Sequence, residues 1–428
     1  DLKGLPPTFE RLMQWLDLFK ALKINSLLVE WEDTFPWQCD PSLRGETFYS
    51  PKQVEEFAAK AADLDIELIP LVQCIGHMEF VLSHDRYAAL RELPDRLDCL
   101  NPLHEQSGPL VQSMVDDVLD RLPNVRRFHL GGDEAYAFAA NDQTAAFAKA
   151  HGHDTLYLHH VEPLLAELAQ RSIRPLLWHD MMMRWSDDSL RRLGSASDLV
   201  VWGYRGRPEE NQHHHSLDLL KRFASLGVPM WAGGSFKGAD GHDAILPNLD
   251  HRLHNTRGWA DIAGKLKFEG VILTAWSRYS TNGISVEPTD VTLDSLAACA
   301  VLIHDGSLPD GGVDTCLDLL PVVDRTIFES MKSKAEAFDH AVNECWRLGR
   351  LILNHAAHLA TDPSRLDGRL PQPLGDMFRQ SVQQSQEHGR ALASVLAESV
   401  GELWAKRFVA ARVRAVRDLF DYVETAAD

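Results

Sequence analysis

The chain alternates short apolar runs with stretches of helical periodicity, and this pattern restricts the fold more than any other feature. The runs are rich in Val, Ile and Leu and show little polar alternation, as expected for parallel strands covered on both faces. The clear runs are 24–31, 66–72, 126–131, 173–178, 199–202, 228–231 and 271–276. The sequence therefore predicts an α/β fold of repeated strand–helix units.

The segments between these runs place apolar side chains on one face of a helix. Examples are the stripes Phe9, Leu12, Leu16; Leu110, Met114, Val118; and Leu158, Val161, Leu165. The first helix precedes the first clear run, so we expect residues 1–4 to be the end of a truncated additional strand. Eight strand–helix units close a barrel, and we predict a (β/α)8 TIM barrel over residues 1–310. An open doubly wound sheet shares the alternation, but no glycine-rich phosphate loop follows the first strand.

The pattern changes near residue 310, where a segment rich in Pro, Gly and Asp ends the alternation. Beyond it, apolar residues recur at helical spacing over long stretches, as in Ile327, Met331, Phe338, Val342 and Trp346. We expect residues 311–428 to form an α-helical C-terminal domain packed on the barrel.

Composition limits the classes of partner. The formal net charge of -19 over 428 residues disfavours nucleic acid and anionic membranes. No apolar run approaches the roughly 20 residues of a membrane span. The six cysteines form no CxxC pair, so neither a zinc site nor a disulfide framework is indicated, and a reducing, cytoplasmic location is favoured. The chain starts at Asp1, so a removed signal peptide stays compatible with the sequence, as does a homodimer.

Two adjacent carboxylates, Asp133 and Glu134, follow the run at 126–131 and a pair of glycines. Residues just past the carboxyl end of a barrel strand lie at the mouth, where catalysis takes place. Close carboxylates push their proton affinities apart, which suits a pair in which one is an acid and the other an anion. The same residues could instead cap a helix, with Asp133 as N-cap and Glu134 in the first turn.

Aromatic residues at other strand ends favour catalysis over capping. Four predicted strands carry a tryptophan at or near their ends: Trp178, Trp202, Trp231 and Trp276. Indole walls with a few polar groups suit a sugar ring, whose C–H faces are apolar and whose hydroxyls need partners. Acids follow the first run at Glu30, Glu32 and Asp33. They are candidate acceptors for hydroxyls, although a solvated loop also explains Glu32 and Asp33.

At these residues the chain resembles glycoside hydrolase family 20, and most closely its hexosaminidase D-like branch. The stretch HLGGDE at 129–134 is similar to the family's acid pair. Other similar stretches are DLKG at 1–4, EWEDTFP at 30–36, IGHMEFVL at 75–82, SFKGADG at 235–241 and TAWSRY at 274–279. The resemblance covers roughly residues 1–305.

The resemblance implies a retaining exo-β-N-acetylhexosaminidase that needs no cofactor or metal. The family is an exception to the use of a carboxylate nucleophile. The substrate's own acetamido oxygen attacks the anomeric carbon and forms an oxazolinium intermediate. By resemblance, Glu134 is the general acid and base, and Asp133 orients the acetamido group. The residues implied to enclose that group are Trp178, Trp202 and Trp276.

Other candidate substrate-binding residues match the family's motifs less closely. They are Glu30, His77, His129, Asp180, Tyr204, Trp231 and Arg278. Both histidines could equally be core residues. The Tyr and Asp that many members carry after the seventh strand are absent, as is the Glu after the strand-eight Trp. The usual arginine of the first strand is not visible, and Asp1 and Lys3 stand there. The residues that hold O4 and O6, and the choice between N-acetylglucosamine and N-acetylgalactosamine, therefore stay open.

Two other functions are compatible with the residues. A metal-dependent barrel hydrolase could use His77, His129, Asp133, His179 and Asp180, although the HxH expected on its first strand is absent. A non-catalytic carbohydrate-binding protein would need no proton donor, and the presence of both acids argues against it. We interpret the triple histidine at 213–215 as a solvated loop rather than a metal site.

Overall fold

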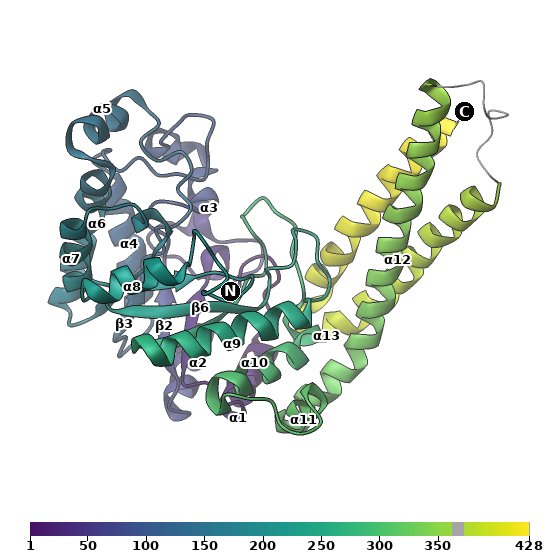
Figure 1. Ribbon diagram of the computed structural model, residues 1–428, viewed down its shortest axis with the longest axis horizontal. Helices are drawn as coiled ribbons and strands as arrows, with labels where there is room; N and C mark the ends of the chain where they lie inside the picture. Colours follow the sequence, from purple (N-terminus) through teal and green to yellow (C-terminus); the bar gives the residue numbers. More distant parts are fainter. Residues whose placement is uncertain (362–371, 428) are drawn as a thin grey trace.

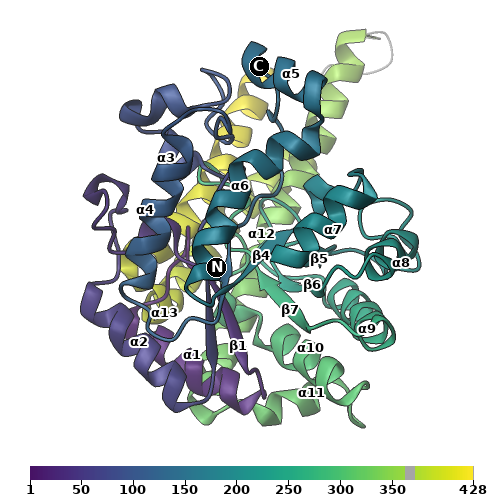
Figure 2. The ribbon, with the colours of Figure 1, turned by 90° about the vertical axis from the view of Figure 1, so that its left-hand side faces the viewer.

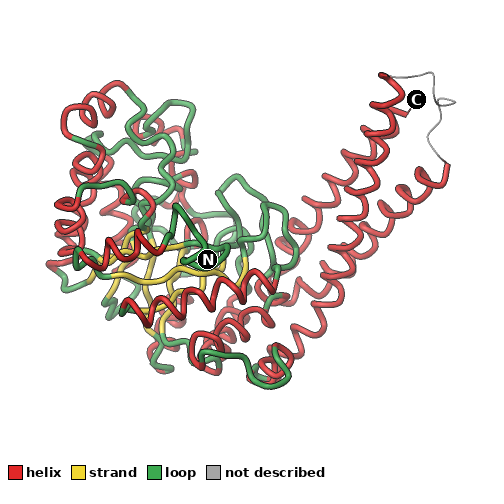
Figure 3. Tube along the Cα trace, in the orientation of Figure 1, coloured by secondary structure: helices red, strands yellow, loops and turns green. Residues whose placement is uncertain are grey.

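The computed structural model describes residues 1–361 and 372–427. Within them, seven parallel strands form one sheet in sequence order. The strands are β1 (Ser26–Glu30), β2 (Glu67–Leu71), β3 (Arg127–His129), β4 (Arg174–Trp178), β5 (Asp198–Trp202), β6 (Met230–Lys237) and β7 (Gly270–Ala275). Each strand overlaps one of the predicted apolar runs. Together the strands curve into a nearly closed barrel inside a layer of helices (Figures 2 and 3).

Helices connect the strands, as the apolar stripes predict. The longer ones are α1 (Phe9–Ala21), α2 (Pro51–Asp63), α4 (Ser107–Leu119), α5 (Asp142–His151), α6 (His153–Gln170), α7 (Asp187–Ala196), α8 (Leu217–Ser225), α9 (Leu249–Leu266) and α10 (Leu293–Asp305). Short helical turns are α3 (Glu79–Leu82), α11 (Val313–Cys316), η1 (Glu32–Thr34), η2 (Pro41–Leu43), η3 (Asp85–Leu90), η4 (Asp180–Met182), η5 (Thr289–Val291) and η6 (Leu317–Leu319). Several start at a side-chain cap; Ser50 and Gln53 form a capping box at α2.

Residues 1–4 do not form the predicted eighth strand. The Leu2 N–H donates to the Glu30 carbonyl at 2.9 Å, and the Asp1 carboxylate accepts from the Ser277 N–H at 2.7 Å. The segment therefore lies between the end of β1 and the loop after β7. It fills the gap between the first and last strands at the mouth without forming a ladder.

Strand β6 extends well past the predicted run at 228–231. It begins at Met230 and ends at Lys237, so Trp231 is its second residue rather than its last. The prediction failed because Gly233 and Gly234 carry little strand propensity. In the fold they permit close packing, since a Cβ on Gly233 would lie 3.0 Å from the Trp202 Cβ.

The barrel is followed by α12 (Val322–Thr361) and α13 (Gln372–Ala427), and the non-helical backbone of Gly401 divides α13 into two helices. These helical segments project together from one side of the barrel (Figure 1). They share an apolar cluster that includes Phe338, Leu392 and Phe408. The predicted C-terminal helical region is confirmed, while its independence as a domain beginning at 311 stays a prediction. None of the helices that the structure describes combines the length and apolar character needed to cross a lipid bilayer.

Arg11 on α1 joins the barrel to this helical region. Its guanidinium pairs with Asp290 of η5 at 2.7 Å and with Asp324 of α12 at 2.7 Å, and all three side chains are buried. A buried cation between two carboxylates resists separation of the parts it joins, since removing it would leave uncompensated charge.

Candidate active site

The acid pair follows a tight turn that requires glycine at the two positions before it. Gly131 and Gly132 follow β3 with φ of 61° and 82°. A Cβ on Gly132 would lie 2.1 Å from the Tyr157 hydroxyl oxygen, so a side chain does not fit there. Asp133 and Glu134 lie outside any helix, and the next helix, α5, is capped by Asn141. The helix-capping alternative is therefore wrong.

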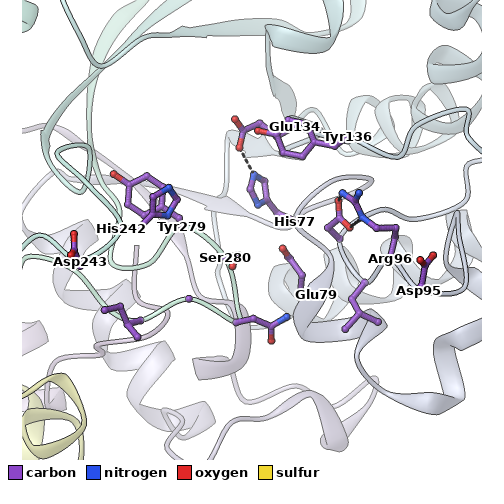
Figure 4. Close-up of a pocket in the computed structure, with 15 residues that line it drawn as sticks. His77, Glu79, Asp95, Arg96, Glu134, Tyr136, His242, Asp243, Tyr279 and Ser280 are labelled. Carbon is purple, nitrogen blue, oxygen red and sulfur yellow. Dashed lines mark hydrogen bonds and ion pairs between the residues drawn. The ribbon is translucent and has the colours of Figure 1, made fainter. Parts of the chain in front are cut away.

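His77, in the loop after β2, contacts both acids. Its Nε2 lies 3.3 Å from Glu134 Oε2 and 3.6 Å from Asp133 Oδ2 (Figure 4). His77 and Glu134 both have positive φ, 52° and 44°. Such strained conformations in non-glycine residues concentrate at functional sites.

The electrostatics of the three groups are linked. Burial raises the pKa of Asp133 to about 7, against the opposing charge of His77. Burial also acts to lower the pKa of His77, but Asp133 and a hydrogen bond to Glu134 raise it to about 10. For Glu134, burial acts upward, yet hydrogen bonds from His77 and Tyr136 bring its pKa below the ordinary value. At neutral pH the substrate-free site therefore holds a protonated His77 beside two carboxyl groups. Of these two, Asp133 has the higher proton affinity.

Asp180, which follows β4, is the third carboxylate of the site. Its Oδ2 accepts from the Glu134 backbone N–H at 2.9 Å, and its Oδ1 accepts from the Trp202 indole at 3.2 Å. Asp180 thus fixes the turn of the acid pair against the aromatic wall. By contrast, Asp133 Oδ1 is buried and has no hydrogen-bond partner among the described residues.

The aromatic wall is continuous across three strand ends. The Trp178 and Trp276 rings lie 5.9 Å apart, and the Trp276 indole donates to the Tyr204 hydroxyl at 2.9 Å. The Tyr204 ring in turn stacks on Trp202 at 5.2 Å. Trp178 is fully buried at the base, and the other three side chains are half-buried. The structure therefore brings together four residues that the sequence singled out separately.

Glu30 and His129 lie beside this wall. Glu30 ends β1 and forms a buried ion pair with Lys3, whose ammonium lies 4.9 Å from the centre of the Trp276 ring. His129 accepts from the Gly131 N–H at 2.9 Å through Nδ1, and burial lowers its pKa to about 3. His129 is therefore a neutral core residue that supports the turn.

Trp231 and Arg278, both predicted to contact the substrate, make polar contacts within the protein. Trp231 donates to the carboxylate of Asp198, the first residue of β5, at 3.1 Å. It lies at the amino-terminal end of the strands, so the expectation that it lines the mouth is wrong. Arg278 follows β7 and is nearly buried, with its guanidinium paired to Glu32 and 3.5 Å from Asp33. It joins two mouth loops.

Beyond the acid pair opens a cavity of about 1130 Å³, which we call the outer cavity. Its lining comes from the loops after β2, β3, β6 and β7, and includes His77, Glu79, Asp95, Asp98, Glu134, Tyr136, Asp243 and Tyr279 (Figure 4). Sequence reasoning missed Glu79 and Tyr136. The only signal for Glu79 was its place in the stretch at 75–82.

Arg412 of α13 braces two of these loops. Its guanidinium donates to the backbone carbonyls of Asp243 at 3.2 Å, Ala244 at 3.0 Å and Ser285 at 2.8 Å, and its side chain is only 3% exposed. The C-terminal helices thus reach these two loops through a buried cation.

The residues of the metal-site alternative are not arranged as metal ligands. Among the residues that the structure describes, no group of three or more His, Cys, Asp or Glu is arranged to hold a metal ion. The His179 ring uses both nitrogens within the protein, donating to the His214 carbonyl at 2.7 Å and accepting from the Trp202 N–H at 3.4 Å. The triple histidine is not a solvated loop as predicted, because His215 is buried and the His214 ring lies 4.0 Å from Trp202.

Comparisons with known proteins agree on one family. The model for "Glycosyl hydrolase family 20, catalytic domain" matches residues 10–217. Hexosaminidase D from Bos taurus is 35% identical over 316 residues, which cover 71% of this chain and 90% of that protein. This chain belongs to glycosyl hydrolase family 20. Hexosaminidase D from Homo sapiens is also 35% identical, over 72% of this chain, although the matched part is 65% of the human protein's length.

Solved structures share the fold. A chitobiase from Flavobacterium johnsoniae superposes with a TM-score of 0.58 at 14% identity, covering 100% of this chain and 73% of that one. A β-N-acetylhexosaminidase superposes with a TM-score of 0.54 at 15% identity, covering 74% of each chain. At such identities the likeness shows the fold alone.

Proposed function

We propose that this glycoside hydrolase is a retaining exo-β-N-acetylhexosaminidase that removes terminal β-linked N-acetylglucosamine or N-acetylgalactosamine by substrate-assisted catalysis. The observation that carries the proposal is the buried, unpartnered Asp133 Oδ1 beside the aromatic wall. A buried carboxylate oxygen without a donor is costly. The N–H of a substrate acetamido group is a donor of the right kind, and the indole faces suit its methyl group.

The exposure of the two acids supports their different roles. Glu134 is 32% exposed and lines the outer cavity, whereas the Asp133 side chain is 8% exposed and lies behind it. The leaving group departs toward the outer cavity, so Glu134 is the acid placed to protonate the glycosidic oxygen. Asp133 faces the acetamido side.

The reaction follows from these positions. Glu134 gives its proton to the glycosidic oxygen as the bond from that oxygen to C1 breaks, and the acetamido oxygen forms a bond to C1. Asp133 accepts the acetamido N–H and stabilises the positive charge of the oxazolinium ring. Water then attacks C1 from the vacated side, gives its proton to Glu134 and releases the acetamido oxygen. Two displacements at C1 retain its configuration.

Substrate binding explains how the proton reaches Glu134. In the substrate-free site the pKa of Asp133 is raised to about 7, while that of Glu134 is lowered. A hydrogen bond from the acetamido N–H favours the ionised form of Asp133, and loss of water around Glu134 favours its protonated form. Both effects move the shared proton to the residue that must donate it.

A hydrolysis panel tests the proposal. We expect 4-nitrophenyl N-acetyl-β-glucosaminide or -galactosaminide to be cleaved with a β-configured first product by NMR, and a thiazoline analogue of the intermediate to inhibit. Glu134→Gln should lose at least about 10²-fold in kcat on a glycoside with a poor leaving group, for want of its proton. An α-configured first product, or equally fast cleavage of the corresponding β-glucoside, would exclude the mechanism.

A further inference from the structure

We propose that the outer cavity is a subsite for the sugar of the leaving group, that it selects uncharged or cationic sugars against anionic ones, and that Glu79 is its specificity residue. The proposal rests on the proposed function, because it takes the outer cavity as the side of Glu134 from which the leaving group departs. It adds a substrate class and a residue that the reaction itself does not require.

Glu79 is a buried carboxylate that forms no ion pair within the described residues; burial raises its pKa, and the positive charge of His77 acts against that rise. Its side chain is 7% exposed, and Oε2 has no hydrogen-bond partner among the described residues. Figure 4 shows its carboxylate directed toward the space between His77 and Ser280. Leaving a buried acceptor unsatisfied is costly, so the free protein is prepared for a ligand that brings a donor. Sugar hydroxyls and ammonium groups are such donors, and a carboxylate or sulfate is not.

The remaining charges of the cavity do not neutralise Glu79. Arg96 is paired with Asp98 at 2.8 Å, and His77 contacts the two acids of the catalytic pair. Neither Glu79 nor Asp95 forms an ion pair within the described part of the chain. The lining of the cavity therefore carries more carboxylates than cations, and an anionic leaving group meets repulsion there.

The rim of the cavity offers an apolar surface for a sugar ring. Tyr136 is 71% exposed, two residues after Glu134, and its ring is free to lie against the C–H face of a pyranose. At about 1130 Å³, the cavity is larger than the roughly 300–1,000 Å³ typical of small-molecule sites. It has room for a sugar beyond the one that is cleaved.

Disaccharides that differ only in the leaving sugar test the selection. N-acetyl-β-glucosaminyl units are linked to glucose, to glucosamine or to glucuronic acid, and kcat/KM is measured at pH 6 beside the 4-nitrophenyl glycoside. The wild type should cleave the glucose and glucosamine compounds at least about tenfold better than the glucuronic acid compound. Equal values for all three would overturn the proposal.

Variants assign the effect to Glu79. Glu79→Gln should reduce the discrimination about tenfold, mainly through KM. Asp85→Asn removes the same charge from an exposed position of the same loop and should leave the discrimination unchanged. If Glu79→Gln keeps the full discrimination, or lowers kcat equally on every substrate, Glu79 is not the specificity residue.

Two further measurements test the selection of the leaving sugar without a variant that could misfold and without requiring turnover. Raising the salt concentration on the wild-type protein should narrow the discrimination, since screening weakens charge repulsion; an unchanged ratio contradicts the electrostatic origin. If even the 4-nitrophenyl glycoside is not cleaved, the proposed function fails. Calorimetric titration with glucosamine and glucuronic acid then decides the selection by itself, and tighter binding of glucuronic acid would refute it.

Discussion

His77 holds a positive charge between the two acids, and replacing it by glutamine should move the pH profile of the enzyme in a calculable direction. At an effective dielectric constant of about 20, unit charges 3.3 and 3.6 Å apart attract by about 5.0 and 4.6 kcal/mol. The pKa of His77 is raised from 6.5 to about 10, which corresponds to about 4.8 kcal/mol. This is less than the two attractions together, because burial of the imidazolium acts against the rise.

Removing this cation must raise the carboxyl pKa values, because the ionised pair loses its counter-charge. In the wild type the pair loses its last proton near pH 7, the value to which the pKa of Asp133 is raised. We therefore expect the alkaline limb of kcat/KM near that pH. Since the His77 side chain is 23% exposed, solvent screens part of the attraction, and His77→Gln should shift the limb upward by about 1–3 units.

The assay is kcat/KM for the 4-nitrophenyl glycoside between about pH 4 and pH 10, with the alkaline pKa as the readout rather than the absolute rate. His84→Gln, in the same loop and without a hydrogen bond or ion pair to either acid among the described residues, serves as the control. A limb that stays in place, or moves to lower pH, would refute the role of His77 as a fixed cation.

The same linkage gives a stability test for His77. Its raised pKa contributes stability that is fully present below pH 6.5 and is lost as the pH rises through about 10. The free energy of unfolding lost in the glutamine variant should therefore be larger at pH 6 than at pH 10 in urea denaturation. An equal loss at both pH values would contradict the raised pKa.

Two further predictions concern the scaffold. Arg11→Met leaves the buried carboxylates of Asp290 and Asp324 without their cation, and should lower the free energy of unfolding by about 3–5 kcal/mol. Adding the two Asp→Asn changes should recover most of that loss in urea titrations, and no recovery would argue against the ion-pair explanation. Gly132→Ala places a Cβ 2.1 Å from the Tyr157 hydroxyl at a φ of +82°. It should cost at least about 1–2 kcal/mol and lower both Tm and kcat; an unchanged Tm would contradict the packing argument.

The sequence predicted those parts of the site that local pattern determines. Asp133 and Glu134 could be found because they follow a strand and two glycines directly. Trp178 and Trp202 could be found because each is the last residue of an apolar run that forms a strand. In these cases the position along the strand alone decides which end of the barrel the side chain occupies.

Residues that depend on packing between distant segments could not be predicted. Trp231 was misplaced because two glycines concealed the continuation of β6. The pairing of Lys3 with Glu30, and of Arg278 with Glu32, joins segments that are 27 and 246 residues apart. No periodicity reports such contacts. Glu79 lies in an apolar, helix-like stretch, and only the fold shows that its carboxylate meets a cavity instead of water.

Arg412 anchors two mouth loops through their backbone, so the attachment does not depend on the side chains of those loops. Its three acceptors in these loops are main-chain carbonyls, of Asp243, Ala244 and Ser285. Every amino acid supplies that oxygen, so substitutions along these loops need not disturb the attachment. Leaving-group preference can therefore diverge between descendants of this chain, or be redesigned in the laboratory, while the loop backbones keep their places.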